Sequence, residues 1–404
     1  MQRRIAVSLA AVTLFIVVEA RGDLLDKLND TLSIRSSEKQ FQLQLSGLID
    51  FEGYFIDQRP PGLIASDDSF LFNPRISLFL DVQVANHFYF FAQARLDRGF
   101  DPWDSGAQLR LDEHFFRYTP LDDASVNFQI GKFATAVGSW VRRHDSWQNP
   151  FINAPLPYEN ITTISDTEAP SSRQDFAGRR FQVTEQYERL PIIWGPNYTS
   201  GAAVLGTIHQ FDYTFEIKNT SVSSRPGNWQ PTQTDWTNPT WSGHVDFRPD
   251  ESWNVGLSGS VGPYMNTDAR STLPIGKNIG NYNQYLLGQD ISFAWRHLQL
   301  WAEVFETRFE VPTAGGADTL SYYFEAKYKI TSQFFGALRW NEQFYGDIGA
   351  SDRPWGNDIW RVDAALGYRF TDYLQTKVQY SFSHQDAPLQ QGEQFIAAQL
   401  TIKF

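Results

Sequence analysis

Apolar and polar residues alternate along most of the chain from Phe41 onward. Between residues 41 and 55 the odd-numbered positions hold phenylalanine, leucine, isoleucine or glycine, whereas most even-numbered positions are polar. The same alternation returns in residues 76–84 and 88–97. A period of two places successive side chains on opposite faces of a β-strand, so that one face meets an apolar phase and the other meets water. The chain is therefore predicted to be all-β over residues 41–404.

The alternating segments predict sixteen strands. We expect them at residues 41–55, 76–84, 88–97, 108–118, 125–134, 200–208, 212–218, 239–248, 253–261, 285–295, 298–309, 320–330, 333–344, 358–370, 373–383 and 394–404. Residues 177–188, which include Phe181 and Val183, are an alternative site for a further strand that raises the count toward eighteen.

The connections between these strands alternate between short and long. Two-residue connections such as residues 331–332 and 371–372 are followed along the chain by polar segments such as residues 345–357 and 384–393. Short turns on one rim and long loops on the other are typical of outer-membrane barrels. The pattern predicts a transmembrane antiparallel β-barrel of 16 to 18 strands, with short periplasmic turns and long extracellular loops.

Aromatic residues are concentrated beside the short connections. Phe370 and Tyr373 bracket one of them, Phe247 and Trp253 bracket another, and Trp295 precedes a third. Rings with an apolar body and a polar edge favour the interface between membrane and water. High β-propensity also enriches aromatics in strands, but it gives no reason for their position at strand ends.

The last eleven residues form the clearest alternating strand. Its apolar residues are Ile396, Ala398, Leu400, Ile402 and the terminal Phe404. This strand resembles the C-terminal strand of bacterial outer-membrane barrels, which ends in phenylalanine. The resemblance implies that the strand closes the barrel and is recognised by the barrel assembly machinery. The alternative is the last strand of a soluble β-sandwich.

Residues 1–20 have the features of a secretory signal peptide. Two arginines precede an apolar run over residues 5–18, and Val18 and Ala20 provide small residues for cleavage. The run is too short for a comfortable membrane helix. We expect export and then insertion into the lipid, including lipopolysaccharide, of the outer membrane of a diderm bacterium.

Residues 21–40 differ from both the leader and the strands. Leu25, Leu28 and Leu32 have helical spacing, so the segment is predicted to be a short periplasmic helix or spacer. The expected organisation is a signal peptide at residues 1–20, this spacer, and a barrel over residues 41–404.

Composition excludes several classes of protein. The 404 residues include no cysteine, which excludes disulfide scaffolds and thiol catalysis. The net charge of −12 argues against nucleic-acid binding. The seven histidines show no metal-ligand spacing and no catalytic motif is present, so we expect no enzyme activity, no metal and no cofactor. A mean hydropathy of −0.39 is compatible with a barrel that has a polar lumen.

The long connection at residues 135–199 is the leading candidate for a functional segment. A loop that folds into a wide barrel narrows the pore and sets its electric field. Its charged residues are candidates for a pore constriction, namely Arg142, Arg143, His144, Asp145, Arg179 and Arg180. The alternative is that these charges are solvated at the extracellular rim.

Charged residues of both signs occupy the positions that are predicted to face the lumen. The pore-lining candidates are Arg75, Arg95, Arg339, Arg361, Asp363, Arg369 and Lys377. A lumen of mixed charge suits small hydrophilic solutes. A packed interior with internal salt bridges is the alternative, although sixteen strands leave a lumen too wide for side chains alone to fill.

Two short segments resemble the phosphate-selective porin family. Residues 129–133, Gln-Ile-Gly-Lys-Phe, together with Gly138, are similar to the strand that leads into the constriction loop of that family. Residues 219–226 and Trp229 are similar to an external loop of related porins. The resemblance implies a sixteen-stranded homotrimer. Ala136 stands where that family has proline, and the arginine ladder and lysine cluster that bind phosphate have no counterparts that can be mapped.

These features favour a porin that passes small hydrophilic solutes and ions by passive diffusion. A solute-specific channel is an alternative, because the 13 tryptophans suit sugar and the arginines suit an anion such as phosphate. A secreted soluble β-protein that binds polysaccharide is a further alternative.

Overall fold

The computed structural model describes residues 31–36, 40–58, 62–64, 66, 68–98, 106–182, 188–229, 236–349, 353–387 and 391–404. The expected signal peptide, and the leucines at 25 and 28, lie outside these residues. No helix in the described ranges is long and apolar enough to cross a membrane.

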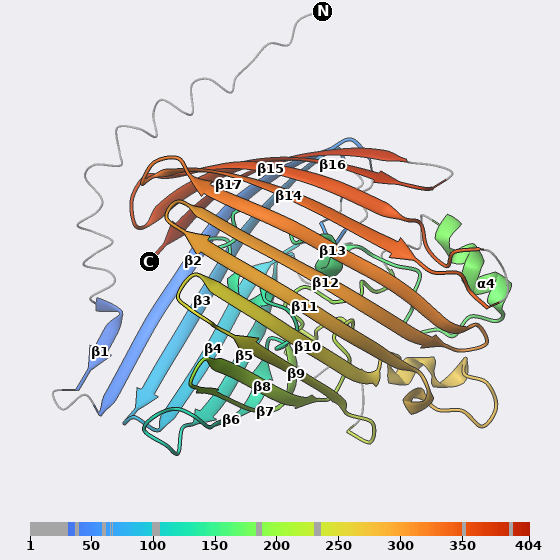
Figure 1. The fold of residues 1–404 in the computed structure, drawn as a ribbon, viewed down its shortest axis with the longest axis horizontal. Coiled ribbons are helices and arrows are strands. Elements are labelled where there is room, and N and C mark those ends of the chain that lie inside the picture. Colours follow the sequence, from blue (N-terminus) through green and yellow to red (C-terminus); the bar gives the residue numbers. More distant parts are fainter. Residues whose placement is uncertain are drawn as a thin grey trace, which may run out of the picture.

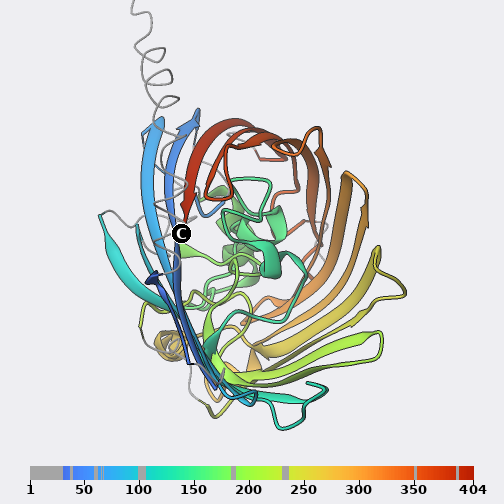
Figure 2. The same cartoon turned by 90° about the vertical axis from the view of Figure 1, so that its left-hand side faces the viewer.

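Sixteen antiparallel strands close into one barrel, as the alternation predicted (Figures 1 and 2). Each strand pairs with its sequence neighbours, and β17 pairs with β2 to complete the ring, with Ile402 opposite Ile49. The strands are β2 (Phe41–Ile56), β3 (Phe70–Val84), β4 (Phe88–Asp97), β5 (Gln108–Tyr118), β6 (Asn127–Phe133), β7 (Thr199–Ile208), β8 (Phe211–Lys218), β9 (Thr240–Phe247), β10 (Trp253–Pro263), β11 (Asn283–Trp295), β12 (Leu298–Val311), β13 (Gly315–Lys329), β14 (Phe334–Tyr345), β15 (Ile359–Arg369), β16 (Leu374–Gln385) and β17 (Gly392–Lys403).

A short strand, β1 (Ser33–Arg35), precedes the barrel and pairs with residues 42–44 of β2. The prediction of a helix over residues 21–40 therefore does not hold for Ser33–Arg35. The physical reason is the length of β17: Phe404, which directly follows it, exchanges backbone hydrogen bonds with Gly47. The residues of β2 that precede Gly47 have no partner in β17, and β1 pairs with three of them.

The possible additional strand at residues 177–188 is not formed in its described part. Residues 173–178 are helix α4 (Arg173–Gly178), followed by the 3₁₀ turn η2 (Arg179–Phe181). Ser172 caps α4 by accepting a hydrogen bond from the Asp175 backbone N–H. Residues 183–187 lie outside the described residues. The barrel closes with sixteen strands.

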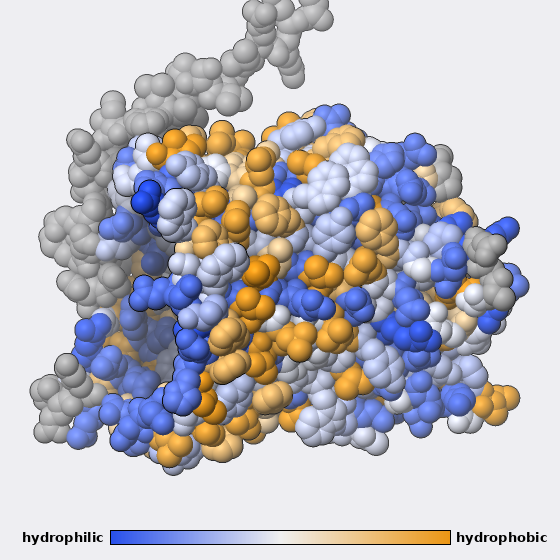
Figure 3. Space-filling model, in the orientation of Figure 1, coloured by the Kyte–Doolittle hydropathy of each residue, from blue (hydrophilic) through white to orange (hydrophobic). Residues whose placement is uncertain are grey.

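The two faces of the wall differ as the alternation requires. Side chains on the outer face, such as Leu338 and Leu366, are apolar and exposed, at 62% and 54%. On the face shown in Figure 3, apolar side chains gather over the middle of the barrel wall, interspersed with polar ones. Polar side chains such as Gln379 and Asp363 are buried on the inner face.

The aromatic residues beside the short turns lie on or near this outer face. The exposed ones are Phe88, Phe247, Trp253 and Trp295. Phe334, Phe370 and Tyr373 are only half-buried. The distribution matches the predicted ring of aromatics at one rim of the barrel.

Candidate functional site

The site begins where the chain leaves the wall after β6, the shortest strand of the barrel. Gly131 in β6 has φ +142°, and a Cβ there would come within 2.2 Å of the His114 carbonyl oxygen, so only glycine fits. Beyond β6, the Thr135 hydroxyl and the Ala136 backbone N–H donate hydrogen bonds to Glu216 of β8. These contacts direct the chain inward.

Residues 134–198 are here called the inner loop. Much of its described part, residues 134–182 and 188–198, lies inside the barrel (Figure 2), whereas helix α4 lies at one end of the barrel (Figure 1). The buried residues Val137, Tyr158 and Trp194 belong to a hydrophobic cluster that also contains Phe305 and Phe309 of β12. The inner loop therefore fills part of the lumen and packs against the wall.

A second segment closes the gap that the inner loop leaves in the wall. The backbone N–H of Leu111, in β5, donates to the carbonyl of Asn228, and the buried Lys132 amine donates to the carbonyls of Leu111 and Gly227. Gly227 and Asn228 thus lie beside the part of β5 that the short β6 does not reach.

Glu303 of β12 holds the beginning of the inner loop. Its Oε1 accepts hydrogen bonds from the backbone N–H groups of Ser139 at 2.6 Å and Trp140 at 2.7 Å. Its Oε2 accepts from the Tyr158 hydroxyl. Gly138, with φ +78°, makes this approach possible because a Cβ there would clash with that hydroxyl. Burial, and next to it the negative charge of Glu303, raises the pKa of Tyr158 well above its ordinary value.

Arg143 attaches the inner loop to the next strand. Its guanidinium lies 2.5 Å from Glu325 Oε1, donates to the Tyr323 hydroxyl at 3.1 Å, and covers the Trp301 ring at 4.3 Å. Burial lowers the pKa of Arg143, but Glu325 outweighs that effect and the net shift is upward. Arg143 is buried against the wall and serves as an anchor.

A further anchor uses the amine of Lys377, in β16. This buried amine donates hydrogen bonds to three carbonyl oxygens of the inner loop, those of Ser146 at 2.8 Å, Asn149 at 2.9 Å and Phe151 at 3.1 Å. It therefore fixes residues 146–151 against the wall.

Three charged residues on β14 and β15 hold the segment that follows. Arg339 donates to Asp363 at 2.8 Å and to the Asn153 side chain at 2.5 Å. Arg361 pairs with Asp363 and lies 2.5 Å from Glu159 of the inner loop. Burial raises the pKa of Glu159, and the Arg361 guanidinium opposes this shift. Arg339, Arg361, Asp363 and also Lys377, which the sequence placed as pore-lining candidates, thus lie beneath the inner loop.

A cavity of about 220 Å³ lies between the inner loop and another part of the wall. It is lined by strands β2 to β5 on one side and by Trp140, His144 and Glu159 of the inner loop on the other. Such a volume has room for several water molecules. Of the pore-lining candidates, Arg75 and Arg95 border this cavity.

Arginines alternate with carboxylates along this part of the wall. Arg75 lies 3.0 Å from Asp50 and 2.7 Å from Glu52. On the next strands, Arg95 pairs with Asp112, and Arg110 pairs with Asp97 and Asp112. The cavity therefore has a polar wall in which neighbouring charges of opposite sign are paired.

His144 faces this cavity from the inner loop. Its Nδ1 lies 2.6 Å from the Val141 carbonyl oxygen, so Nδ1 carries the proton and Nε2 accepts from the Tyr198 hydroxyl at 2.6 Å. Burial, and next to it the positive charge of Arg95, lowers the pKa of His144. Asp145 accepts hydrogen bonds from the backbone N–H groups of Trp147 and Gln148, so it shapes the loop.

The remaining candidates are spread along the interior. Arg142 is half-exposed and lies 2.6 Å from Asp246 of β9. Arg180 donates to the carbonyl of Pro354, in a long loop, and Arg179 is buried nearby in η2. Arg369 lies over the Trp147 ring toward the short-turn end of β15. The structure therefore does not bring the six constriction candidates together at one point.

Sequence reasoning missed the loop-side partners of this site. Tyr158 and Asn153 contact wall residues and Tyr198 contacts His144, but all three lie in a segment without period two. The signals that were available are the two glycines, Gly131 and Gly138, whose positive φ marks the inward turn.

Solved structures with the same fold are outer-membrane porins and channels. OmpF from Salmonella typhi, in a complex with daunomycin, matches with a TM-score of 0.59 and 11% identity over 92% of this chain and 100% of that one. The outer membrane channel DcaP of Acinetobacter baumannii matches with a TM-score of 0.57 and 10% identity, over 92% of this chain and 99% of that one. An anion-selective porin from Comamonas acidovorans matches with a TM-score of 0.55 and 10% identity, over 90% of this chain and 100% of that one.

No protein-family model and no curated protein sequence matches the chain. The likeness to solved structures establishes the porin barrel fold. The resemblance to phosphate-selective porins stays a prediction.

Proposed function

We propose that the chain is an outer-membrane porin, a water-filled channel through which small hydrophilic solutes and ions diffuse passively. The observation that carries the proposal is the cavity of about 220 Å³ between the inner loop and the charged residues of strands β2 to β5. A loop anchored inside the barrel narrows the lumen without filling it, which is how a diffusion channel sets a size limit.

The outer surface supports a membrane location over a secreted soluble protein. Large exposed apolar patches are rare on soluble monomers, whereas here many large apolar side chains are exposed along the strands, and they gather over the middle of the face shown in Figure 3. The expected environment is the lipid, including lipopolysaccharide, of a diderm outer membrane. Export through a cleaved signal peptide and insertion by the barrel assembly machinery belong to the same proposal.

The pairing of charges supports general diffusion over a channel specific for anions. Four carboxylates, Asp50, Glu52, Asp97 and Asp112, lie beside Arg75, Arg95 and Arg110 of the cavity wall. Fixed charges of both signs cancel at a distance, so the wall does not present the excess of positive charge that would concentrate phosphate. We infer no catalytic role for these residues.

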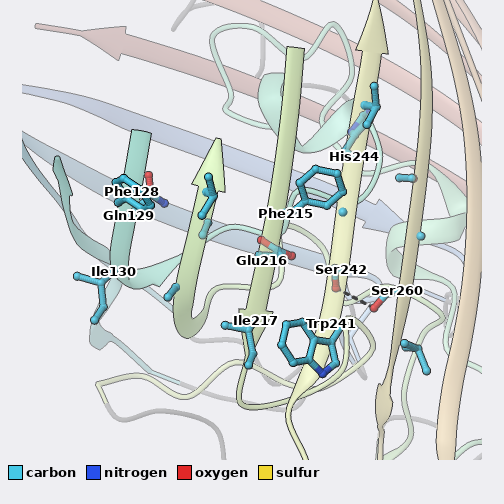
Figure 4. A pocket seen from close by; sticks show the side chains of 18 of the residues that line it. Phe128, Gln129, Ile130, Phe215, Glu216, Ile217, Trp241, Ser242, His244 and Ser260 are labelled. Carbon is cyan, nitrogen blue, oxygen red and sulfur yellow. Dashed lines mark hydrogen bonds between the residues drawn. The ribbon is translucent and has the colours of Figure 1, made fainter. Parts of the chain in front are cut away.

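A homotrimer is part of the proposal. The outer wall carries an apolar groove of about 930 Å³ over strands β5 to β11, with Ile130, Ile217 and Trp241 among its lining residues (Figure 4). A second copy of the chain suits this groove, because packing there removes apolar area from lipid without exposing polar groups. Light scattering in detergent should give the mass of three chains, and a monomer would contradict this part.

Reconstitution into planar bilayers tests the channel itself. Purified protein should insert in conductance steps that grow linearly with salt concentration, and a trimer should show them in groups of three. Saturation of conductance by one solute would favour a solute-specific channel for a sugar or an anion. A protein that stays in solution without detergent and never conducts would refute the proposal.

A further inference from the structure

Three buried side chains on the inner wall converge at a position that the proposed channel does not use. His244 and Asp246 lie on β9, and Asp290 lies on β11. Between them, on β10, Gly256 pairs in register with both Asp246 and Asp290. A Cβ at Gly256 would come within 2.2 Å of Asp290 Oδ2 and 2.5 Å of His244 Nε2. The missing side chain of Gly256 is what allows the three groups to meet.

The hydrogen bond on the other ring nitrogen fixes the orientation of His244. Its Nδ1 lies 2.8 Å from the Ala136 carbonyl oxygen, which has no proton to give, so Nδ1 is the donor. A backbone carbonyl that orients imidazole in this way is the usual outer contact of a metal-binding histidine. The other nitrogen, Nε2, points at the carboxylates, 3.2 Å from Asp246 Oδ1 and 3.1 Å from Asp290 Oδ2.

This arrangement leaves buried polar atoms without hydrogen bonds. Apart from the contacts that His244 Nε2 and the two carboxylates make with one another, neither oxygen of Asp290 and no other face of His244 Nε2 has a hydrogen-bond partner among the described residues, although the Asp290 side chain is only 2% exposed. Asp246 differs, because Asn254 donates to its Oδ1 at 2.9 Å and Arg142 approaches its Oδ2 at 2.6 Å. Two carboxylates and a ring nitrogen therefore face a common point with unused lone pairs.

A proton on His244 Nε2 would satisfy only some of these carboxylate oxygens. A single Nε2–H can be directed at one carboxylate oxygen and leaves at least one Asp290 oxygen unsatisfied. A metal ion can serve all three groups at once. Ligand atoms about 2.1 Å from a shared Zn²⁺ lie roughly 3.0–3.4 Å apart, which is the spacing of Nε2 from both carboxylates.

We propose that His244, Asp246 and Asp290 form a binding site for a divalent first-row transition metal ion of the zinc class. One imidazole and two carboxylates are ligands that Zn²⁺ accepts, with Asp290 able to supply one or both oxygens. The ligand-bearing atoms of the three groups all lie within 4.8 Å of one another. The sequence predicts no metal, because the histidines show neither HxH nor HExxH spacing. Here a single histidine and two aspartates supply the ligands, from β9 and β11.

The position of Arg142 gives the site a second testable property. Arg142 is half-exposed to the interior and neutralises Asp246, so it competes with a metal ion for negative charge. Replacing it with alanine should strengthen metal binding. The same residue belongs to the inner loop, and metal occupancy is therefore linked to the wall contact made by residues 136–142.

Titration with Co²⁺ tests the site directly, because the visible absorption of bound Co²⁺ reports ligation. The whole protein, folded in detergent and freed of metal with a chelator, should bind one Co²⁺ per chain, and Zn²⁺ should displace it. Binding by H244A and by D290N should weaken at least a hundredfold, whereas R142A should bind about tenfold more tightly. The matched control is H384A, because His384 is a partly exposed histidine 3.7 Å from Asp386.

Folding is checked separately, since a compact barrel migrates differently in gel electrophoresis before and after heating. The proposal would be overturned if the folded wild-type protein did not bind Co²⁺ when one equivalent per chain is added. Folded H244A and D290N proteins that bind as wild type does, or loss of binding in H384A alone, would also overturn it. None of these readouts depends on conductance, so the test is independent of the proposed channel function.

Discussion

Single residues determine the charge of the cavity, because arginines and carboxylates on neighbouring strands form ion pairs. Arg75 borders the cavity and neutralises both Asp50 and Glu52. Replacing Arg75 with alanine leaves those two carboxylates as a fixed negative field, which attracts cations. One unit charge at 4 Å contributes about 1 kcal/mol even in bulk water, so the permeability ratio of cations to anions should rise about fivefold.

The measurement is the reversal potential across a bilayer with a salt gradient at neutral pH. Arg75→Lys should keep the wild-type value, since the sign of the charge is retained. Arg248→Ala is a matched control, because Arg248 is an exposed arginine paired with Asp212 at the short-turn rim. An unchanged potential in Arg75→Ala would show that ions do not pass this wall.

His144 predicts a dependence of stability on pH. Burial and Arg95 lower its pKa, so the folded protein resists protonation of His144 more than the unfolded chain does. The unfolded chain therefore binds the proton first as the pH falls below about 6.5, and the free energy of unfolding decreases from there toward the lower folded pKa. Above the unfolded pKa the neutral ring is present in both states and this loss is absent.

His144→Gln should show a smaller decrease, because glutamine does not titrate and can still accept from the Tyr198 hydroxyl. The measurement is the urea midpoint at pH 7.5 and pH 5 in one detergent, with His384→Gln as the exposed control. Equal decreases in wild type and His144→Gln would contradict the assignment.

At the element scale, the inner loop depends on a few buried cations. Lys377 donates to three carbonyls of residues 146–151. In Lys377→Met these carbonyls lose their donor, and each unsatisfied buried group costs about 1–3 kcal/mol. The methionine has similar length and fills the space, so the barrel should fold while the inner loop loosens.

We expect Lys377→Met to show noisier single-channel currents and faster protease cleavage within residues 146–151. The control is Lys329→Met, because Lys329 is exposed at the end of β13. Quiet channels and wild-type resistance to protease in Lys377→Met would mean that other contacts suffice to hold this segment.

The strands could be predicted from the sequence, whereas the path of the inner loop could not. All sixteen strands follow from period two, because a wall with lipid on one side and a polar lumen on the other imposes that period directly. The inner loop has no such period. Nothing in the sequence distinguishes Arg75, which borders the cavity, from Lys377, which lies under the loop, since both are cations at inward strand positions.

The same limit explains why the sequence does not reveal that His244, Asp246 and Asp290 converge. The spacing of His244 and Asp246 places both on one face of a strand, and this was visible in the sequence. Their meeting with Asp290 depends on the register of β10 with both neighbours, which places Gly256 between the two aspartates. Register is set by the whole barrel and cannot be derived from one segment.

At the scale of the whole molecule, the closure of the barrel depends on the last residue of the chain. Phe404 and Gly47 exchange two backbone hydrogen bonds, of 2.9 Å and 3.1 Å. An open seam in lipid would leave N–H and C=O groups unpaired at several kcal/mol each. The outward residues of β17, Ile396, Ala398, Leu400 and Ile402, alternate with buried ones, as predicted for a strand that faces lipid.

Deleting Phe404 should therefore prevent assembly. The change removes the two hydrogen bonds at one end of the seam and, by resemblance to other barrels, the recognised end of the assembly signal. We expect less than about a tenth of the wild-type amount of folded protein in the outer membrane fraction, measured as the band that shifts on heating. Lys403→Ala is the matched control, because the Lys403 amine lies 5.6 Å from the Trp147 ring of the inner loop and hence on the lumen side.

Gly47→Val tests the same seam from the other strand, with the C-terminal signal intact. A Cβ at Gly47 would lie 2.5 Å from the Phe404 ring and 2.9 Å from the Ser77 carbonyl oxygen, so valine must displace the ring or the neighbouring strand. If closure itself limits assembly, Gly47→Val should fail as the deletion does, both in cells and when the purified chain is refolded in detergent. If only the terminal signal matters, Gly47→Val should assemble normally. Because refolding in detergent needs no assembly machinery, failure there would assign the defect to the seam.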